Sequence, residues 1–138
     1  MSQHRVAITR CEHFNAAHRL HNPQWSEERN QETFGKCNNT NYHGHNYDLE
    51  VTVVGHIDPD TGFVMDAKVL SDIVKREVIE RLDHKNLNLD VPEFANLNPT
   101  AENIAVVIHD LVKKHLSPNH ELKIKLYETR RNVVEYPA

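Results

Sequence analysis

The sequence from Cys37 to Val53 constrains the fold more than any other stretch, because it places two histidines at the start of a strand-like alternation. His43 and His45 are followed by an apolar residue at every second position, namely Tyr47, Leu49, Val51 and Val53. Successive side chains of a strand point to opposite faces, so both imidazoles share the apolar face. The intervening positions are polar, which is typical of an antiparallel strand with one solvated face. The pattern predicts a strand that holds two histidines at the edge of a buried core.

A histidine pair two residues apart on a strand can hold a zinc ion, because both imidazoles converge on one point and bind in the neutral form. The best candidate for a third ligand is His18, which ends another extended segment. Three histidines without a fourth protein ligand are the composition of a catalytic zinc site with an open position. The alternative is that they are ordinary strand histidines. Cys37 nearby and Gly44, which lets the backbone approach closely, favour a Zn²⁺ site on His18, His43 and His45.

Length and composition indicate one domain, residues 1–138, with a single core. The net charge of −4 and the pI near 6.2 argue against a nucleic-acid partner. No stretch approaches the roughly 20 apolar residues that span a bilayer, and the first residues lack the apolar run of a signal peptide. Two cysteines cannot form a disulfide framework. We therefore expect a cytoplasmic protein that binds neither membranes nor nucleic acid.

The first strand, predicted over residues 5–20, has an interrupted apolar face. Arg10 and Glu12 fall at core-facing positions, which indicates a bulge or a long edge strand. The polar segment 22–35 follows, and Trp25 could open a short helix within it. Loops of this length in a compact domain are usually functional or disordered, so we expect this segment to pass over the site.

Two long helices are predicted in the middle of the chain. Asp66 is a good N-cap for a helix over residues 67–82, whose apolar residues recur at spacings of three and four. Thr100 caps a second helix, which Ser117 and Pro118 end. The last two strands follow, at residues 122–128 and 133–136. These elements predict an α+β fold in the order ββααββ, with both helices on one face of a four-stranded antiparallel sheet. Since the other face and the edges stay open, we expect a homo-oligomer.

Glu128 is the second unusual residue of the sequence. It continues the core-facing row of the third predicted strand, which consists of Leu122, Ile124 and Leu126. A carboxylate at the end of an apolar row indicates a polar contact at a site. The alternative is a surface ion pair with Arg130 or Lys125, which the alternation of faces disfavours.

Five separated segments together resemble the 6-pyruvoyltetrahydropterin synthase family of the tunnelling (T-fold) group. They are FNAAHRL, CNNTNYHGHNY, LDHKNLNLDVPEFA, TAEN and LYET, in unbroken order over nearly the whole chain. The resemblance implies a zinc-dependent lyase that converts 7,8-dihydroneopterin triphosphate to 6-pyruvoyltetrahydropterin and releases triphosphate. It also implies a homohexamer of two trimers, each trimer forming a closed β-barrel that covers the sheet edges.

The resemblance also implies roles for individual residues. It places zinc on the three histidines and makes Cys37 the base that transfers protons, with Asp83 and His84 as its partners from a neighbouring subunit. Glu128 would anchor the pterin, because a carboxylate offers two acceptor oxygens to the ring N3–H and 2-amino group. Thr100, where the family often has two threonines in succession, would contact the same ring. Lys36 beside the cysteine, a histidine and the metal would all favour the thiolate.

Three other functions are also compatible with parts of this sequence. A sister enzyme, 6-carboxytetrahydropterin synthase of the queuosine pathway, takes the same substrate but typically has three residues between the cysteine and the HGH motif, whereas this chain has five. Another relative serves folate synthesis and has glutamate where this chain has Cys37. A zinc-binding module without catalysis would explain the histidines alone. In that case Cys37 is a small buried residue, and Asp83 and His84 merely end a helix.

Overall fold

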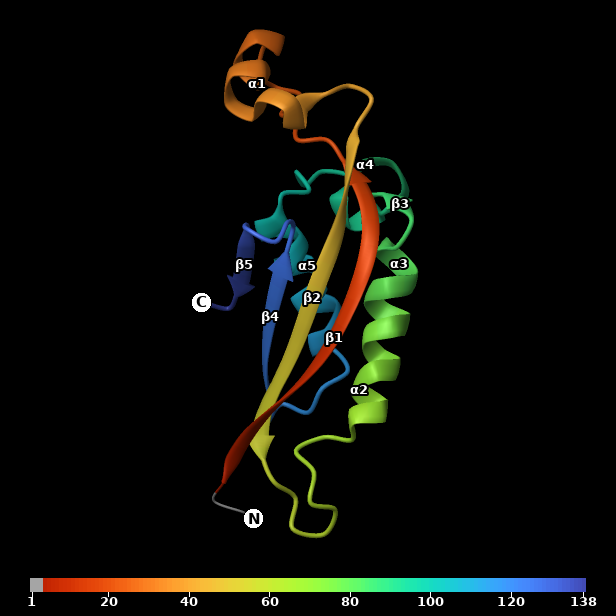
Figure 1. Cartoon of the computed structure of the whole chain (residues 1–138), viewed down its shortest axis with the longest axis vertical. Helices are drawn as coiled ribbons and strands as arrows, with labels where there is room; N and C mark the ends of the chain where they lie inside the picture. The colour runs from red at the N-terminus through yellow and green to blue at the C-terminus, as the bar shows by residue number, and fades with distance from the viewer. Residues whose placement is uncertain (1–3) are drawn as a thin grey trace.

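The structure is a computed structural model that describes residues 4–138, and it has the predicted α+β class. One twisted sheet forms a layer against which the long helices pack (Figure 1). Its strand order is β3-β1-β2-β4-β5. The strands are β1 (Arg5–His18), β2 (His43–His56), β3 (Lys85–Asn86), β4 (Glu121–Tyr127) and β5 (Val133–Tyr136).

The prediction of four antiparallel strands is wrong in one respect, because the sheet has a fifth strand and is mixed. The extra strand, β3, is two residues long and pairs in parallel with Ala16 and Ala17 of β1, whereas the other four strands pair antiparallel. A two-residue strand has no periodicity that a sequence pattern could reveal. It forms because the chain after the first long helix returns along the edge of β1.

The two long predicted helices are both present on one face of the sheet. The first is continuous over α2 (Ala67–Val74), the π-helical turn η2 (Lys75–Ile79) and α3 (Glu80–Leu82). Its N-cap is Asp66, whose side chain accepts a hydrogen bond from the Lys68 amide at 2.9 Å. The second is α5 (Ala101–Lys113), capped by Thr100. The short helices are α1 (Glu27–Phe34), η1 (Gly35–Asn38), α4 (Leu87–Asp90) and η3 (Pro92–Phe94).

Strand β1 pairs with β2 over all fourteen residues and has no bulge. The bulge that was predicted as one of two alternatives is therefore absent. Arg10 and Glu12 do occupy the helix-facing side, and they neutralise each other through an ion pair at 3.0 Å. Apart from the two residues that pair with β3, β1 is a long edge strand, as the other alternative predicted.

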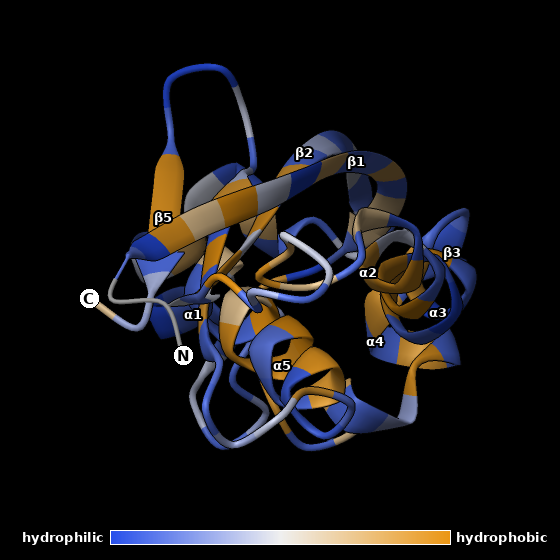
Figure 2. Ribbon diagram, turned by 90° about the horizontal axis from the view of Figure 1, so that it is seen from below, coloured by the Kyte–Doolittle hydropathy of each residue, from blue (hydrophilic) through white to orange (hydrophobic). Residues whose placement is uncertain are grey.

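The core lies between the inner face of the sheet and the long helices, where Figure 2 shows hydrophobic segments of both layers facing each other. Phe14 stacks on Tyr47 at a ring-centroid distance of 4.9 Å, near the end of the β1–β2 pair. The outer face is polar, with hydrogen bonds such as that between the Thr9 and Thr52 hydroxyls at 2.8 Å. Within residues 4–138, no helix combines the length and apolarity needed to cross a bilayer.

The ends of β1 and β2 that carry the predicted ligands lie beside the polar excursion. His18 and His43 are cross-strand partners at this end. The excursion between the two strands contains α1 and η1 and extends past the sheet at the top of Figure 1. The short helix predicted near Trp25 is therefore present, with Ser26 as its N-cap. The fold places the loop residues next to the histidines.

Candidate functional site

The structure brings the three predicted metal ligands together. His18 faces His43 across the β1–β2 ladder, and His45 lies two residues further along the same face of β2. One ring nitrogen from each histidine lies within 4.8 Å of the others. The cross-strand register alone produces this convergence, since the inner face of each strand repeats every two residues. The three rings are thus arranged as a group that could hold one metal ion.

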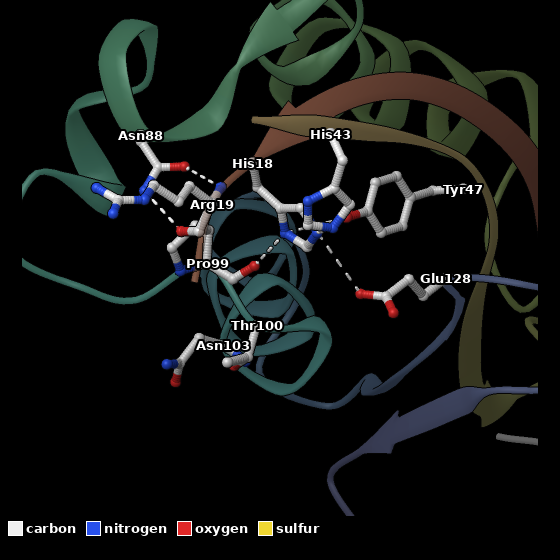
Figure 3. Close-up of polar contacts among 9 residues, drawn as sticks. All are labelled: His18, Arg19, His43, Tyr47, Asn88, Pro99, Thr100, Asn103 and Glu128. Atoms are coloured by element: carbon white, nitrogen blue, oxygen red, sulfur yellow. Dashed lines mark hydrogen bonds and ion pairs between the residues drawn. The ribbon is translucent and has the colours of Figure 1, made fainter. Parts of the chain in front are cut away.

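His18 is fully buried, and its hydrogen bond fixes its tautomer. The Nδ1 atom lies 2.7 Å from the carbonyl oxygen of Pro99 (Figure 3). A carbonyl oxygen only accepts, so Nδ1 carries the hydrogen and Nε2 keeps its lone pair. That lone pair lies 3.0 Å from Nε2 of His43. Burial, opposed by the Pro99 carbonyl and reinforced by His43 and His45, lowers the pKa of His18 to about 4. The ring is therefore in the neutral form that binds metals.

The other two rings also fit a metal. Nδ1 of His43 and Nε2 of His45 are buried and have no hydrogen-bond partner among the described residues. Buried polar atoms are normally paired, so unpaired nitrogens on adjacent rings need a partner that the protein does not supply. Burial also lowers the pKa of His43. Together with the facing Nε2 atoms of His18 and His43, the unpaired Nε2 of His45 forms a donor set that suits Zn²⁺.

Gly44, between the two β2 histidines, is not required for close backbone approach. A Cβ atom built at this position would lie 3.5 Å from the Ala16 carbonyl oxygen, an ordinary van der Waals contact, and it would meet nothing closer. Within one chain, no close backbone approach therefore explains why a glycine stands at this position.

Cys37 shares a cavity with two of the histidines. It lies in η1 and lines a cavity of about 570 Å³ together with His43 and His45. Burial, followed by the charge of Glu128, raises the pKa of the Cys37 thiol above its ordinary value. This direction is opposite to the one expected from Lys36, whose side chain is exposed. The residues of one chain therefore favour the thiol over the thiolate.

Glu128 also borders the histidine cluster. Its Oε2 is 4.0 Å from Nε2 of His18, with the side chain 22% exposed (Figure 3). Together with Thr100 it lines a second cavity of about 500 Å³. The alternative ion pair with Lys125 is not formed, because that lysine lies 3.8 Å from Glu135 instead. A carboxylate next to the histidine cluster thus borders a pocket large enough for a small molecule.

Asp83 and His84 are close to each other but not to the histidine cluster. Nδ1 of His84 lies 2.9 Å from Oδ2 of Asp83, directly after α3. Both residues bind the backbone of Asn15 on the edge of β1, through Asp83 Oδ1 at 2.8 Å and the His84 amide at 2.6 Å. The hydrogen bond from Asn15, with His84 also contributing, lowers the pKa of Asp83. Neither residue lines the cavities of Cys37 or Glu128, and the His84 side chain is 83% exposed.

Two contacts at the site were not predicted. The Pro99 carbonyl is a backbone group, so no side-chain pattern reveals it. The hydroxyl of Tyr47 lies 3.5 Å from Nδ1 of His18, and burial raises the pKa of that hydroxyl. The alternation of faces along β2 could have predicted the contact of Tyr47, because this residue follows His43 and His45 on the inner face of the strand.

Comparison with known proteins identifies the family. The family model described as 6-pyruvoyl tetrahydropterin synthase matches residues 7–138. A Drosophila melanogaster protein named 6-pyruvoyl tetrahydrobiopterin synthase is 48% identical over 138 residues, which cover 99% of this chain and 82% of that protein. The Homo sapiens protein of the same name is 47% identical over 129 residues, covering 94% and 89%. The solved structure of Caenorhabditis elegans 6-pyruvoyl tetrahydropterin synthase superposes with a TM-score of 0.93 at 37% identity, covering 100% and 99%. The chain belongs to the 6-pyruvoyl tetrahydropterin synthase family and is an enzyme of the lyase class.

Proposed function

We propose that this enzyme uses zinc, held by His18, His43 and His45, to convert 7,8-dihydroneopterin triphosphate to 6-pyruvoyltetrahydropterin with release of triphosphate. The observation that carries the proposal is the position of the histidine cluster. It borders the Cys37 cavity through two of its rings and lies 4.0 Å from the Glu128 carboxylate that borders the other cavity. The relatives that carry the synthase name support the reaction.

The pterin ring would occupy the cavity that Glu128 and Thr100 line. The two carboxylate oxygens of Glu128 match the adjacent N3–H and 2-amino donors of a pterin. The hydroxyl oxygen of Thr100 accepts from the Asn103 amide at 3.1 Å, so its hydrogen remains free to donate to the ring. Leu20, Ala101 and Val133 supply apolar walls to the same cavity. This arrangement would direct the side chain of the pterin towards the histidines.

Proton transfer within the substrate side chain would depend on Cys37. Zinc, when bound, supplies Lewis-acid stabilisation of negative charge on the side-chain oxygens of the substrate. Cys37 would then accept and return protons at the neighbouring carbons. The pKa of its thiol is raised by burial and by Glu128, so this residue needs a nearby cation to act as a base. A cation bound by the adjacent histidines would supply that charge.

Asp83 and His84 would serve the site of a neighbouring copy of the chain. The pair is preformed, with the His84 side chain exposed and Asp83 half-buried, and it lines neither cavity of its own chain. Asp83 fixes the ring of His84, which leaves Nε2 available for a proton relay. We therefore propose a homo-oligomer, a hexamer of two trimers by analogy with the family resemblance, in which facing chains complete each site.

Incubation of the zinc-loaded protein with 7,8-dihydroneopterin triphosphate, followed by mass spectrometry of the pterin, tests the proposal. We expect 6-pyruvoyltetrahydropterin and free triphosphate without acetaldehyde. Release of acetaldehyde would instead show the 6-carboxytetrahydropterin reaction. A Cys37→Ala variant should keep its zinc and lose turnover. Unchanged substrate with the parent protein would contradict both reactions and leave a zinc-binding module.

A further inference from the structure

The carbonyl group that orients His18 belongs to a short segment before α5. Pro99 is buried, and its oxygen lies 2.7 Å from Nδ1 of His18 (Figure 3). This hydrogen bond sets the tautomer and the rotation of the ring, because it is strongest when the ring N–H points straight at the carbonyl oxygen. Any change in the direction of the Pro99 carbonyl would therefore turn the nitrogen that faces His43.

The direction of this carbonyl is fixed by hydrogen bonds to Asn98. The Pro99 carbonyl and the Thr100 amide belong to one planar trans peptide, in which the C=O and the N–H point in opposite directions. The Thr100 amide donates to the Asn98 carbonyl oxygen at 2.8 Å. The Pro99 oxygen must then point away from Asn98. Because the peptide is planar, the hydrogen bond that holds its N–H also fixes the direction of its C=O.

The Asn98 carbonyl is in turn held by the side chain of Asn103. Nδ2 of Asn103, in the first turn of α5, donates to that oxygen at 2.9 Å. A second contact, from the His21 amide to Oδ1 of Asn98 at 3.2 Å, ties the same residue to the segment that follows β1. Figure 3 shows Asn103 next to Thr100, below the Pro99–His18 contact. Three hydrogen bonds therefore connect the amide of Asn103 to the ring of His18.

We propose that Asn103 is a positioning residue for the metal centre, acting on His18 through Asn98, the Pro99–Thr100 peptide and the Pro99 carbonyl. The inference rests on the proposed role of the three histidines as zinc ligands. The competing explanation is that Asn103 only stabilises the start of α5. These two roles predict opposite outcomes for the same substitution.

Asn103→Asp separates the two roles. Asn103 is the third helical residue after the Thr100 cap, a position where an acidic side chain favours the helix. Aspartate has nearly the same size, but it has no N–H to donate and places a carboxylate oxygen against the Asn98 carbonyl. Asn103→Ala also removes the donor and has a higher helix propensity. Neither variant weakens the helix, and both remove the contact to Asn98.

Zinc affinity is the decisive measurement. We expect both variants to bind zinc about 10-fold more weakly than the parent, since residues behind metal ligands typically contribute 10- to 100-fold in affinity. The affinity is measured by competition between the metal-free protein and a chromophoric chelator. Asn119→Asp, an Asn-to-Asp change in an exposed turn, is the matched control and should bind zinc as the parent does. Thermal unfolding of the metal-free variants should show midpoints close to that of the parent, because the gain in the first turn of α5 opposes the loss of the hydrogen bond.

The tautomer of His18 provides an independent readout. Long-range ¹H–¹⁵N spectra of the metal-free parent should show His18 with its hydrogen on Nδ1, and both variants should show a mixture of tautomers. Affinities within twofold of the parent, with the Nδ1–H form retained, would overturn the inference. A parent that binds no zinc through the histidines would overturn it as well. If the parent binds zinc but forms no pterin product, the proposed reaction fails, and the affinity ratio still decides the role of Asn103.

Discussion

The predicted site residues form two groups, the histidine cluster and the Asp83–His84 pair, and a single chain brings only the first group together around a cavity. His18, His43 and His45 converge within 4.8 Å, with Cys37 and Glu128 bordering them, because two paired strands fix their positions. Asp83 and His84 form a pair that is equally well defined, but it lies on the exposed edge of β1 and faces neither cavity. The buried group depends on the register of the sheet, whereas the exposed pair depends on what a second chain places against it.

The largest effect should come from removing one metal ligand from the buried group. His43→Ala leaves two imidazoles, so zinc affinity should fall on the order of 10⁴-fold, about 5.5 kcal/mol, together with all turnover. Competition with a chelator measures the affinity. His56→Ala, at the exposed far end of the same strand, is the control and should bind zinc as the parent does. Tight zinc binding by His43→Ala would contradict the assignment of the three histidines as the zinc ligands.

The exposed pair predicts complementation between chains. Cys37→Ala and His84→Ala should each lower turnover about 10³-fold, within the range for proton-transfer groups. When the two variants are unfolded together and reassembled in equal amounts, sites that combine one intact Cys37 with one intact His84 should restore about a quarter of the parent activity, as expected for random mixing in a symmetric oligomer. If the mixture stays as inactive as either variant, both residues act within one chain, and Asp83 and His84 do not serve a second chain.

The pH dependence of stability tests the buried group alone, because burial of His18 as a neutral ring makes the metal-free protein less stable in acid. The pKa of this ring is about 4 in the folded chain and 6.5 in the unfolded one. Between these values the unfolded chain binds more protons, so the free energy of unfolding falls as the pH falls. The contribution is complete above pH 6.5, and roughly 3 kcal/mol is lost as the pH approaches 4. Urea unfolding of metal-free protein at pH 7 and pH 4.5 measures it. Equal unfolding free energies would contradict the buried neutral state.

The smallest effect is predicted for Gly44, between the two β2 histidines of the buried group. The space at this position accepts a methyl group, and alanine is slightly more stable than glycine within a strand. Gly44→Ala should therefore change the unfolding free energy by less than about 1 kcal/mol and zinc affinity by less than threefold. A loss of zinc binding in this variant would show that a second chain approaches the glycine closely in the assembly.

The sequence predicted the buried group better than the exposed pair, because only the buried group lies on strands with regular alternation. His43, His45 and Glu128 were found because alternation along a strand assigns each side chain to a face, and a polar residue in an apolar row is conspicuous. The position of His18 opposite them also followed from strand pairing. No periodicity marked Asp83 and His84, and the family resemblance alone implied that they serve a neighbouring subunit. Their anchoring to the backbone of Asn15 had no sequence signal.

The unpredicted features are those without a side-chain signal. Strand β3 has two residues and forms through backbone hydrogen bonds to β1. The orientation of His18 depends on the carbonyl of Pro99, which any residue could supply. The raised pKa of Cys37 comes from burial and from Glu128, which is remote in sequence, whereas the neighbouring Lys36 that the sequence suggested is exposed. Each depends on chain segments that meet only after folding.

X-ray absorption spectroscopy of the zinc-loaded protein tests the central claim most directly. If three imidazoles hold the metal and leave one position open, the spectrum should show only nitrogen and oxygen neighbours at about 2.0–2.1 Å, and it should not change in Cys37→Ala. A sulfur neighbour at about 2.3 Å that disappears in that variant would show Cys37 as a fourth ligand. The site would then be closed, and the thiol could not serve as the base.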